Sequence, residues 1–333
     1  MDLESEIQSF GADLSRLRDE IKKAIVGQEE VVDQILVCLL ADGHALLEGA
    51  PGLGKTLLVK TLSNCLALDF RRIQFTPDLM PADILGTNLV VERDGKKEFE
   101  FQRGPIFGNV VLADEINRAT PKTQSALLEV MEEHAVTIAG ERRPVDEPFL
   151  VLATQNPIEM EGTYPLPEAQ LDRFLFKIHI AAPDEETLVE ILDATTGSER
   201  GTPEAVLDAD RIHALRAIAR HVPIAPPLVR YVARLVQATQ PQNDHAADEA
   251  RKYLRHGAGV RGAQSIVLAA KVQALMAGRP NVAFEDLRAA ALPALRHRLI
   301  LNFEGEAEGV RRDDILALIL DGLPELPADL ANA

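Results

Sequence analysis

The stretch Gly49-Ala50-Pro51-Gly52-Leu53-Gly54-Lys55-Thr56 decides the fold predicted for this chain of 333 residues. It matches the pattern G-x-x-x-x-G-K-[ST], a loop whose glycines let backbone N–H groups converge on phosphate oxygens without obstruction by a Cβ atom. A short apolar strand at 45–48 precedes the loop, and a segment with helical spacing, 57–68, follows it. A glycine-rich turn with a stray lysine would lack this strand–loop–helix context, so the stretch is interpreted as a phosphate-binding loop.

Each part of this loop has a predicted role in binding ATP. Lys55 is expected to reach the β- and γ-phosphates, as a catalytic as well as a binding residue, and Thr56 to offer its hydroxyl to Mg²⁺. The helix that begins at Lys55 adds the positive end of its dipole. The predicted nucleotide-binding residues of the loop and the first helical turn are Gly49, Ala50, Pro51, Gly52, Leu53, Gly54, Lys55, Thr56 and Leu57.

A phosphate-binding loop of this kind needs an acidic partner at the end of a neighbouring apolar strand. The apolar segment 109–113 supplies one, because it ends in Asp114 and Glu115. We expect Asp114 to hold Mg²⁺ through its water shell and Glu115 to polarise the attacking water as a general base. The alternative, two surface acids at a strand end, is weakened by the presence of the loop.

Two further polar residues are candidates for the same site. Asn156 follows the apolar strand 149–154, where its amide can approach the γ-phosphate and the attacking water, although an Asn before a proline is also a common turn signal. Arg173 carries a guanidinium that can stabilise negative charge in the transition state. The alternative for Arg173 is a structural salt bridge with Asp172 or Glu168.

The order of apolar strands and helices predicts an α/β fold of two domains. Strands that alternate with helices up to residue 182 indicate a parallel sheet with helices on both faces, in a P-loop domain over 1–182. Hairpins are expected at 88–103, around Asp94-Gly95, and at 135–145. Residues 183–333 have helical periodicity without a convincing strand, which predicts an all-α second domain.

Composition narrows the class of protein. A formal net charge of -17 and a pI of about 4.9 disfavour a general nucleic-acid binder or a protein of anionic membranes. Cys38 and Cys65 lie in apolar segments and are expected to be buried thiols. No signal peptide is visible, and the apolar region 35–47 is too short and too interrupted to span a bilayer, so a cytoplasmic, soluble protein is expected.

Taken together, these residues resemble the MoxR family of AAA+ ATPases, which is related to the ATPase subunits of magnesium chelatase. The resemblance covers roughly residues 20–300 and is most specific between 49 and 176. Besides the loop, the stretches that carry it are IVGQ at 25–28, QFTPDLMPADILG at 74–86, GPIF at 104–107, LADEINRA at 112–119, PKTQSALLE at 121–129, ATQNP at 153–157 and EGTYPLPEAQLDRF at 161–174.

The resemblance implies an AAA+ core followed by a helical lid domain, with a role for several residues. Val26, Gly27 and Gln28 should line the adenine pocket, and Asn156 resembles the sensor 1 residue. Arg173 resembles the arginine finger that acts on the ATP of a neighbouring subunit. Arg261, in the stretch 257–261, resembles the phosphate-contacting sensor 2 residue, although Gly259 stands where the family usually has Ser. The two hairpins resemble the helix 2 insert and the pre-sensor hairpin.

The resemblance also implies a homo-oligomer, a hexameric ring in the family's pattern, that works with a von Willebrand factor A domain protein and a client protein. The leading hypothesis is therefore an ATP-driven, chaperone-like remodelling motor. A chelatase-type ATPase subunit would have the same nucleotide site. A nucleic-acid motor is disfavoured by the acidic charge, although cationic side chains near the expected hairpin tips would suit one: Arg93, Lys96, Lys97, Arg142 and Arg143.

Overall fold

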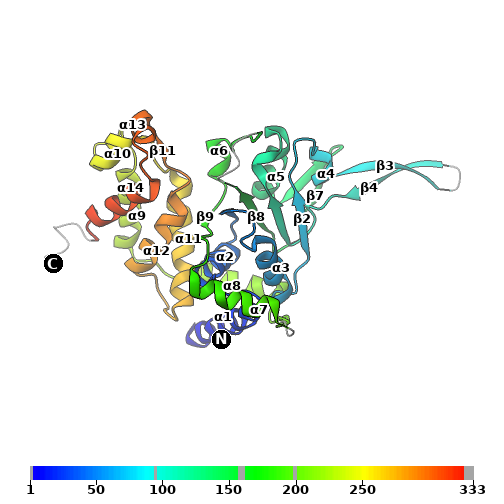
Figure 1. The fold of residues 1–333 in the computed structure, drawn as a ribbon, viewed down its shortest axis with the longest axis horizontal. Coiled ribbons are helices and arrows are strands. Elements are labelled where there is room, and N and C mark those ends of the chain that lie inside the picture. Colours follow the sequence, from blue (N-terminus) through cyan, green and yellow to red (C-terminus); the bar gives the residue numbers. More distant parts are fainter. Residues whose placement is uncertain (1–2, 94–95, 157–161, 198–200, 326–333) are drawn as a thin grey trace.

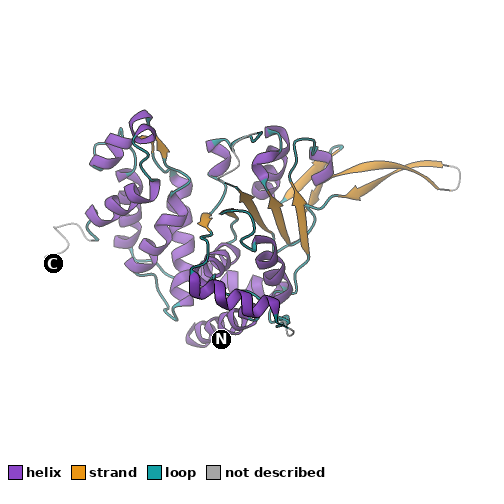
Figure 2. Cartoon of the chain, in the orientation of Figure 1, coloured by secondary structure: helices purple, strands orange, loops and turns teal. Residues whose placement is uncertain are grey.

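A five-stranded parallel sheet forms the centre of the computed structural model, which describes residues 3–93, 96–156, 162–197 and 201–325. The strands run in the order β2-β5-β8-β1-β9 (Figures 1 and 2). Their bounds are Ala45–Glu48 for β1, Phe70–Gln74 for β2, Val110–Asp114 for β5, Leu150–Gln155 for β8 and Phe176–His179 for β9. The α/β class predicted from the sequence is confirmed.

Both faces of this sheet are covered, which explains why its strands are continuous apolar runs. Alternate residues point to opposite faces, so Leu47 packs with the first helices of the chain while its neighbour Leu46 packs on the other side. The helices of the Leu47 side are α1 (Leu3–Lys22), α2 (Glu29–Leu40) and α3 (Lys55–Cys65). Those of the Leu46 side are α4 (Pro81–Leu85) and α5 (Pro121–Glu133), with the short 3₁₀ helix η1 (Ile116–Arg118) after β5.

Two antiparallel hairpins leave the core where the sequence predicts them. The longer one pairs β3 (Gly86–Arg93) with β4 (Lys96–Arg103) and projects far from the sheet (Figure 1). Its expected turn, Asp94-Gly95, lies outside the described residues. The shorter one pairs β6 (Ala135–Ile138) with β7 (Glu141–Pro144).

The rest of the chain is mainly helical, as expected, but it contains a small ladder that the sequence did not predict. Strand β10 (Leu254–His256) pairs with β11 (Ile300–Leu301). These strands are too short to produce an alternating pattern, which is why periodicity missed them. The helices are α6 (Glu168–Leu171), α7 (Glu185–Thr196), α8 (Ala209–His221), α9 (Pro226–Ala238), α10 (Asp248–Tyr253), α11 (Val260–Met276), α12 (Phe284–Leu295), α13 (Phe303–Ala307) and α14 (Arg312–Gly322).

Hydrophobic packing continues across the predicted boundary at residue 182. Helix α8 contacts α2 and α11, and α11 in turn contacts α1 and α2. Arg216 of α8 donates from Nε to the Leu39 carbonyl of α2 at 2.9 Å. The division into 1–182 and 183–333 stays a prediction, because the apolar cluster spans both parts of the chain.

Two expectations from composition can be compared with the structure. Cys38 and Cys65 are free, buried thiols, and burial raises the pKa of Cys65 to about 11. Among the described residues, we find no helix that combines the length and the apolar character needed to cross a bilayer.

Candidate nucleotide-binding site

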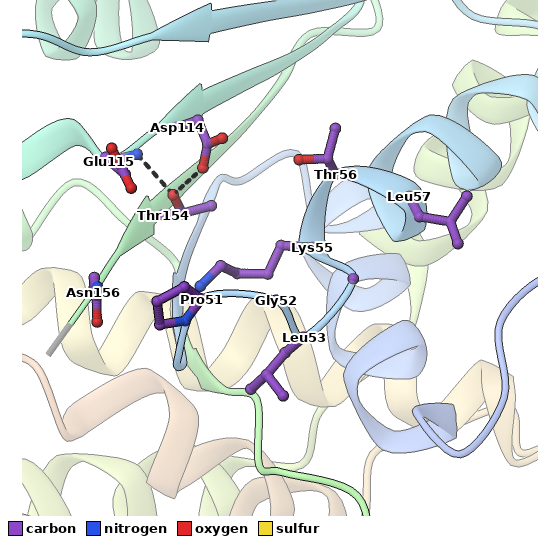
Figure 3. A pocket seen from close by; sticks show the side chains of 11 residues that line it. Pro51, Gly52, Leu53, Lys55, Thr56, Leu57, Asp114, Glu115, Thr154 and Asn156 are labelled. Atoms are coloured by element: carbon purple, nitrogen blue, oxygen red, sulfur yellow. Dashed lines mark hydrogen bonds between the residues drawn. The ribbon is translucent and has the colours of Figure 1, made fainter. Parts of the chain in front are cut away.

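The predicted site lies where strands β1, β5 and β8 end at one edge of the sheet. In a parallel sheet these carboxyl ends meet, so the loop after β1 and the side chains after β5 and β8 are brought together. They enclose a cavity of about 350 Å³ (Figure 3). Its lining residues are Pro51, Gly52, Leu53, Gly54, Lys55, Thr56, Leu57, Asp114, Glu115, Thr154 and Asn156.

The loop between β1 and α3 has a backbone that favours glycine. Gly52 and Gly54 have φ angles of 83° and 75°, in the left-handed region, and no atom lies within 4 Å of a Cβ added at either residue. Lys55 folds back over the loop, and its Nζ donates to the carbonyls of Gly49 at 2.6 Å and Ala50 at 3.1 Å. Burial lowers the pKa of Lys55, an effect opposed by the nearby carboxylates of Asp114 and Glu115.

A threonine joins the two acids at the end of β5. The Thr154 hydroxyl donates to Asp114 Oδ1 at 2.7 Å and accepts the backbone N–H of Glu115 at 2.8 Å (Figure 3). Glu115 has a φ of 56°, which is uncommon for a residue with a side chain and is often found at functional sites. Thr154 thereby fixes the backbone turn that separates the directions of the two carboxylates.

Three polar side chains that the sequence analysis did not assign also hold these acids. Arg72 Nη2 donates to Asp114 Oδ2 at 2.7 Å. Gln74 Nε2 donates to Glu115 Oε2 at 2.8 Å, and Arg118 Nη1 donates to the same oxygen at 3.0 Å. Arg72 and Gln74 belong to β2, whose place next to β5 depends on the order of the strands. No local signal in the sequence reveals that order.

A second, larger cavity adjoins the first. It has a volume of about 1180 Å³ and shares Gly52, Leu53, Gly54 and Leu57 with the smaller cavity. The three residues predicted for the adenine pocket, Val26, Gly27 and Gln28, line it, together with residues of α7. Gln28 Nε2 donates to the Leu53 carbonyl at 3.1 Å, which ties this segment to the phosphate-binding loop.

Gly27 brings the same segment close to helix α7. Its φ is 70°, and a Cβ added there would lie 2.1 Å from Cγ2 of Thr187. None of the residues of α7 is buried, and Thr187, Leu188 and Ile191 face the cavity. The walls of the larger cavity are therefore the segment before α2 on one side and α7 on the other.

The structure does not bring the two predicted arginines into either cavity. Instead, both contact Glu132 near the end of α5. Arg173 Nη2 lies 2.9 Å from Glu132 Oε2, and Arg261 Nη2 donates to Glu132 Oε1. The salt bridges weighed for Arg173 do not form, because Asp172 pairs with Arg298 and Glu168 pairs with Arg255. Sequence spacing alone offered no sign of Glu132, which shares a face with these residues only in the folded chain.

Comparison with known proteins gives the family. Residues 44–176 match the model of the ATPase family associated with various cellular activities (AAA), and residues 246–319 match the model of the AAA lid domain. The chaperone MoxR1 of Mycobacterium tuberculosis is 43% identical over 95% of this chain and 83% of that protein. The chain belongs to the MoxR family of AAA+ ATPases. The protein MoxR of Paracoccus denitrificans is 30% identical to it over 96% of this chain and 97% of that protein.

A solved structure gives this MoxR-family chain an experimental counterpart. A protein from Cytophaga hutchinsonii, named as a candidate ATPase, superposes with a TM-score of 0.89 at 41% identity, covering 96% of this chain and 97% of that one. The AAA+ core and the helical lid implied by the sequence resemblance are thus confirmed as the fold. Residues 177–245, between the two matched models, are matched by neither.

Proposed function

We propose that this chain hydrolyses ATP to drive chaperone-like remodelling or maturation of a partner protein. The observation that carries the proposal is the smaller cavity, in which the glycine-rich loop meets Asp114, Glu115 and Asn156. Loop N–H groups and Lys55 are suited to phosphate oxygens, while the acids and the amide are suited to a metal ion and a water molecule. The adjoining larger cavity offers space for the nucleoside beside Val26, Gly27 and Gln28.

The donor set fits Mg²⁺. Thr56 and Asp114 both line the smaller cavity and supply a hydroxyl and a carboxylate oxygen, ligands of the hard type that Mg²⁺ prefers. Asp114 Oδ2 already accepts a cationic partner, Arg72, so this position suits positive charge. When bound, Mg²⁺ would neutralise charge that develops on the phosphate oxygens.

Glu115 is the proposed general base. Gln74 and Arg118 hold its Oε2, which leaves Oε1 as the oxygen to accept a proton from water. The water oxygen forms a bond to the γ-phosphorus as the bond from the γ-phosphorus to the bridging oxygen breaks, and the proton passes to Glu115. The amide of Asn156, which lines the same cavity, is proposed to orient that water, and Lys55 to stabilise the charge on the phosphates.

Arg173 and Arg261 are proposed to act on the ATP of a neighbouring subunit in a ring, with six subunits as in the family's pattern. This assignment is supported by their common position on Glu132, outside the cavities of their own chain. Two guanidinium groups on one face can stabilise the transition state only if another copy of the chain brings its phosphates to them. Loss of the γ-phosphate would release them and shift the lid.

The remodelling part of the proposal rests on the relatives and on the long hairpin. A relative is named as a chaperone, and Val90 and Phe99 face each other across β3 and β4 with exposed fractions of 59% and 78%. An apolar pair on a projecting element suits contact with a protein, either the client or the proposed von Willebrand factor A domain partner. Near the tips, Arg93 pairs with Glu100 and Arg143 with Glu141, which weakens the reading as a nucleic-acid motor.

Steady-state ATP turnover of a Glu115→Gln variant tests the enzymatic part. Gln keeps the size of the side chain and can still meet Gln74 and Arg118, but it cannot accept a proton. We expect ATP binding to be retained and turnover to fall by about 10²- to 10⁴-fold. Unchanged turnover would remove Glu115 as the base.

Two further experiments test the remodelling part of the proposal. Strong stimulation of the wild-type rate by DNA would favour a nucleic-acid motor. Co-purification from the native host would identify the protein partner.

A further inference from the structure

Arg173 and Arg261, which are proposed to act on the phosphates of a neighbouring subunit's ATP, are called the phosphate-directed arginines below. Arg298, just after α12 in the lid, is the most completely buried guanidinium near them. Its side chain is 3% exposed, and all three nitrogens donate hydrogen bonds. Nε donates to the Asp172 carboxylate at 2.7 Å, and Nη2 donates to the carbonyls of Asp172 and Phe174, each at 2.9 Å. Arg298 is therefore hydrogen-bonded to the main chain on both sides of Arg173.

The same guanidinium also contacts the helix that carries Arg261. Nη2 of Arg298 donates to the Ser265 hydroxyl at 3.2 Å, and that hydroxyl donates to the Arg261 carbonyl one turn earlier in α11 at 2.8 Å. Helices α11 and α12 approach closely here, since a Cβ added at Gly262 would lie 2.9 Å from Cδ2 of Leu295, and it would lie 3.2 Å from Cδ of Arg298. Arg298 is thus linked to the backbone at both Arg173 and Arg261.

Glu132 completes a ring of hydrogen bonds and ion pairs between the core and the lid. This ring, called the circuit below, consists of Glu132, Asp172, Arg173, Arg261, Ser265 and Arg298. Its carboxylate contacts the side chains of Arg173 and Arg261, while Arg298 contacts the main chain beside Arg173 and, through Ser265, that of Arg261. The core supplies Glu132 and the segment 172–174, and the lid supplies the rest. Each phosphate-directed arginine is therefore constrained at its backbone and at its side chain.

We propose that Arg298 is a positioning residue, which holds Arg173 and Arg261 as one unit so that both reach the same ATP of a neighbouring subunit. This inference rests on the proposed function, because it requires the two arginines to act between subunits. Arginine is suited to the position, because its planar fork can donate to several carbonyls and a carboxylate at once. A lysine has a single nitrogen and cannot span these partners.

The proposal predicts a selective defect in an Arg298→Ala variant. The smaller cavity, where the phosphates are proposed to bind, contains no residue of the circuit. The affinity of the variant for a fluorescent ATP analogue should therefore stay within about twofold of the wild-type value. Its ATP turnover should fall by about 10- to 100-fold, since small misplacements of catalytic groups cost factors of this size. Wild-type turnover in this variant would overturn the proposal.

Mixing experiments distinguish a positioning defect from general damage. Lys55→Ala subunits lack a working phosphate loop but keep their arginines, whereas Arg298→Ala subunits keep the loop. In an equal mixture, about one interface in four joins an intact loop to intact arginines, so turnover should rise well above that of either variant alone. A subunit that had lost its fold would not be rescued in this way.

An Arg173→Ala variant mixed with Lys55→Ala is the reference. If this reference mixture recovers turnover and the Arg298→Ala mixture does not, the positioning role is wrong while the proposed function stands. If neither mixture recovers, the action of arginines between subunits is wrong, and the inference fails with it.

Milder variants keep the test valid if Arg298→Ala does not fold, because removal of a buried charge leaves its partners unpaired. Ser265→Ala and Asp172→Asn each weaken one link of the circuit and leave Arg298 in place. Each should lower turnover by about 3- to 10-fold, the effect of one hydrogen bond. Mixed with Lys55→Ala subunits, each should show a higher turnover per subunit that retains the phosphate loop. Absence of any effect in both would also overturn the proposal.

A matched control and a conservative variant complete the design. Arg288, also in α12, donates within the lid to the Leu320 carbonyl at 3.1 Å and to Asp321 Oδ1 at 3.0 Å. Arg288→Ala should therefore leave turnover unchanged. Arg298→Lys should recover part of the loss, because it restores the charge beside Asp172 but not the fork.

Discussion

At the scale of single residues, the site combines groups that are adjacent in the sequence with groups that meet only on folding. The glycine-rich loop, Lys55, Thr56, Asp114 and Glu115 are recognisable because each belongs to a short local pattern. Further contributors belong to no pattern that assigned them a role, although Gln74, Arg118 and Thr154 stand in stretches that carry the family resemblance. These contributors are Arg72, Gln74, Arg118, Glu132, Thr154 and Arg298. They are found by asking which polar groups hold the predicted ones in place.

Thr154 is the clearest of these supporting residues, and its removal gives a testable effect. A Thr154→Val substitution keeps the shape but deletes the hydroxyl that joins Asp114 Oδ1 to the Glu115 N–H. The unpaired N–H should cost about 1–3 kcal/mol of unfolding free energy, and ATP turnover should fall as the two carboxylates lose their alignment.

The measurements are urea unfolding and steady-state turnover on the same preparation. Thr123→Val is a matched control, because the Thr123 hydroxyl is also buried but donates to the Leu79 carbonyl, away from the lining of the cavity. Loss of stability in both variants with loss of turnover only in Thr154→Val is the expected result. Equal turnover in the two would indicate that the hydroxyl has no role in the site.

At the scale of elements, local signals predicted which segments form helices and strands better than they predicted which of these elements lie side by side. Strand β1 has the predicted bounds, 45–48, because the burial of a short apolar run is encoded locally. The order of the strands and the β10–β11 ladder depend on contacts between distant segments. For that reason the sequence did not reveal that β2 would bring Arg72 and Gln74 to the acids of β5.

A titratable contact joins the residue after α5 to the segment just before strand β8. His134, the residue that follows α5, lies with its Nδ1 2.5 Å from Glu147 Oε1, and Glu147 Oε2 accepts the Phe149 N–H at 3.0 Å. The hydrogen bond with Glu147 raises the pKa of His134, against an opposing effect of burial. A raised folded-state pKa means that protonated His134 stabilises the fold at low pH.

We therefore predict a pH-dependent stability difference between the wild type and a His134→Asn variant. Asn tolerates the left-handed backbone at this position, where φ is 49°, but it does not titrate. The stabilisation by His134 is complete below its unfolded pKa of 6.5 and is lost as the pH rises through the raised folded pKa. Urea unfolding at a series of pH values should show the difference shrinking with rising pH. A constant difference would contradict this assignment.

At the scale of the whole molecule, the two halves of the proposed reaction lie in different parts of one chain. The phosphate cavity lies at the edge of the sheet, whereas Arg173 and Arg261 gather on Glu132 outside it. We propose that a single copy holds ATP on one side and offers arginines on another, and that contact between copies brings the two together. The sequence resemblance implied this for Arg173, and the contact with Glu132 extends it to Arg261.

The turnover of mixed subunits tests this composite site most directly. Lys55→Ala and Arg173→Ala chains would each be nearly inactive alone, because the first lacks a phosphate lysine and the second lacks the arginine offered to its neighbour. Mixed in varying proportions, they should recover turnover that peaks near equal amounts, where about one interface in four is complete. Turnover equal to the sum of the separate chains at every proportion would contradict the account.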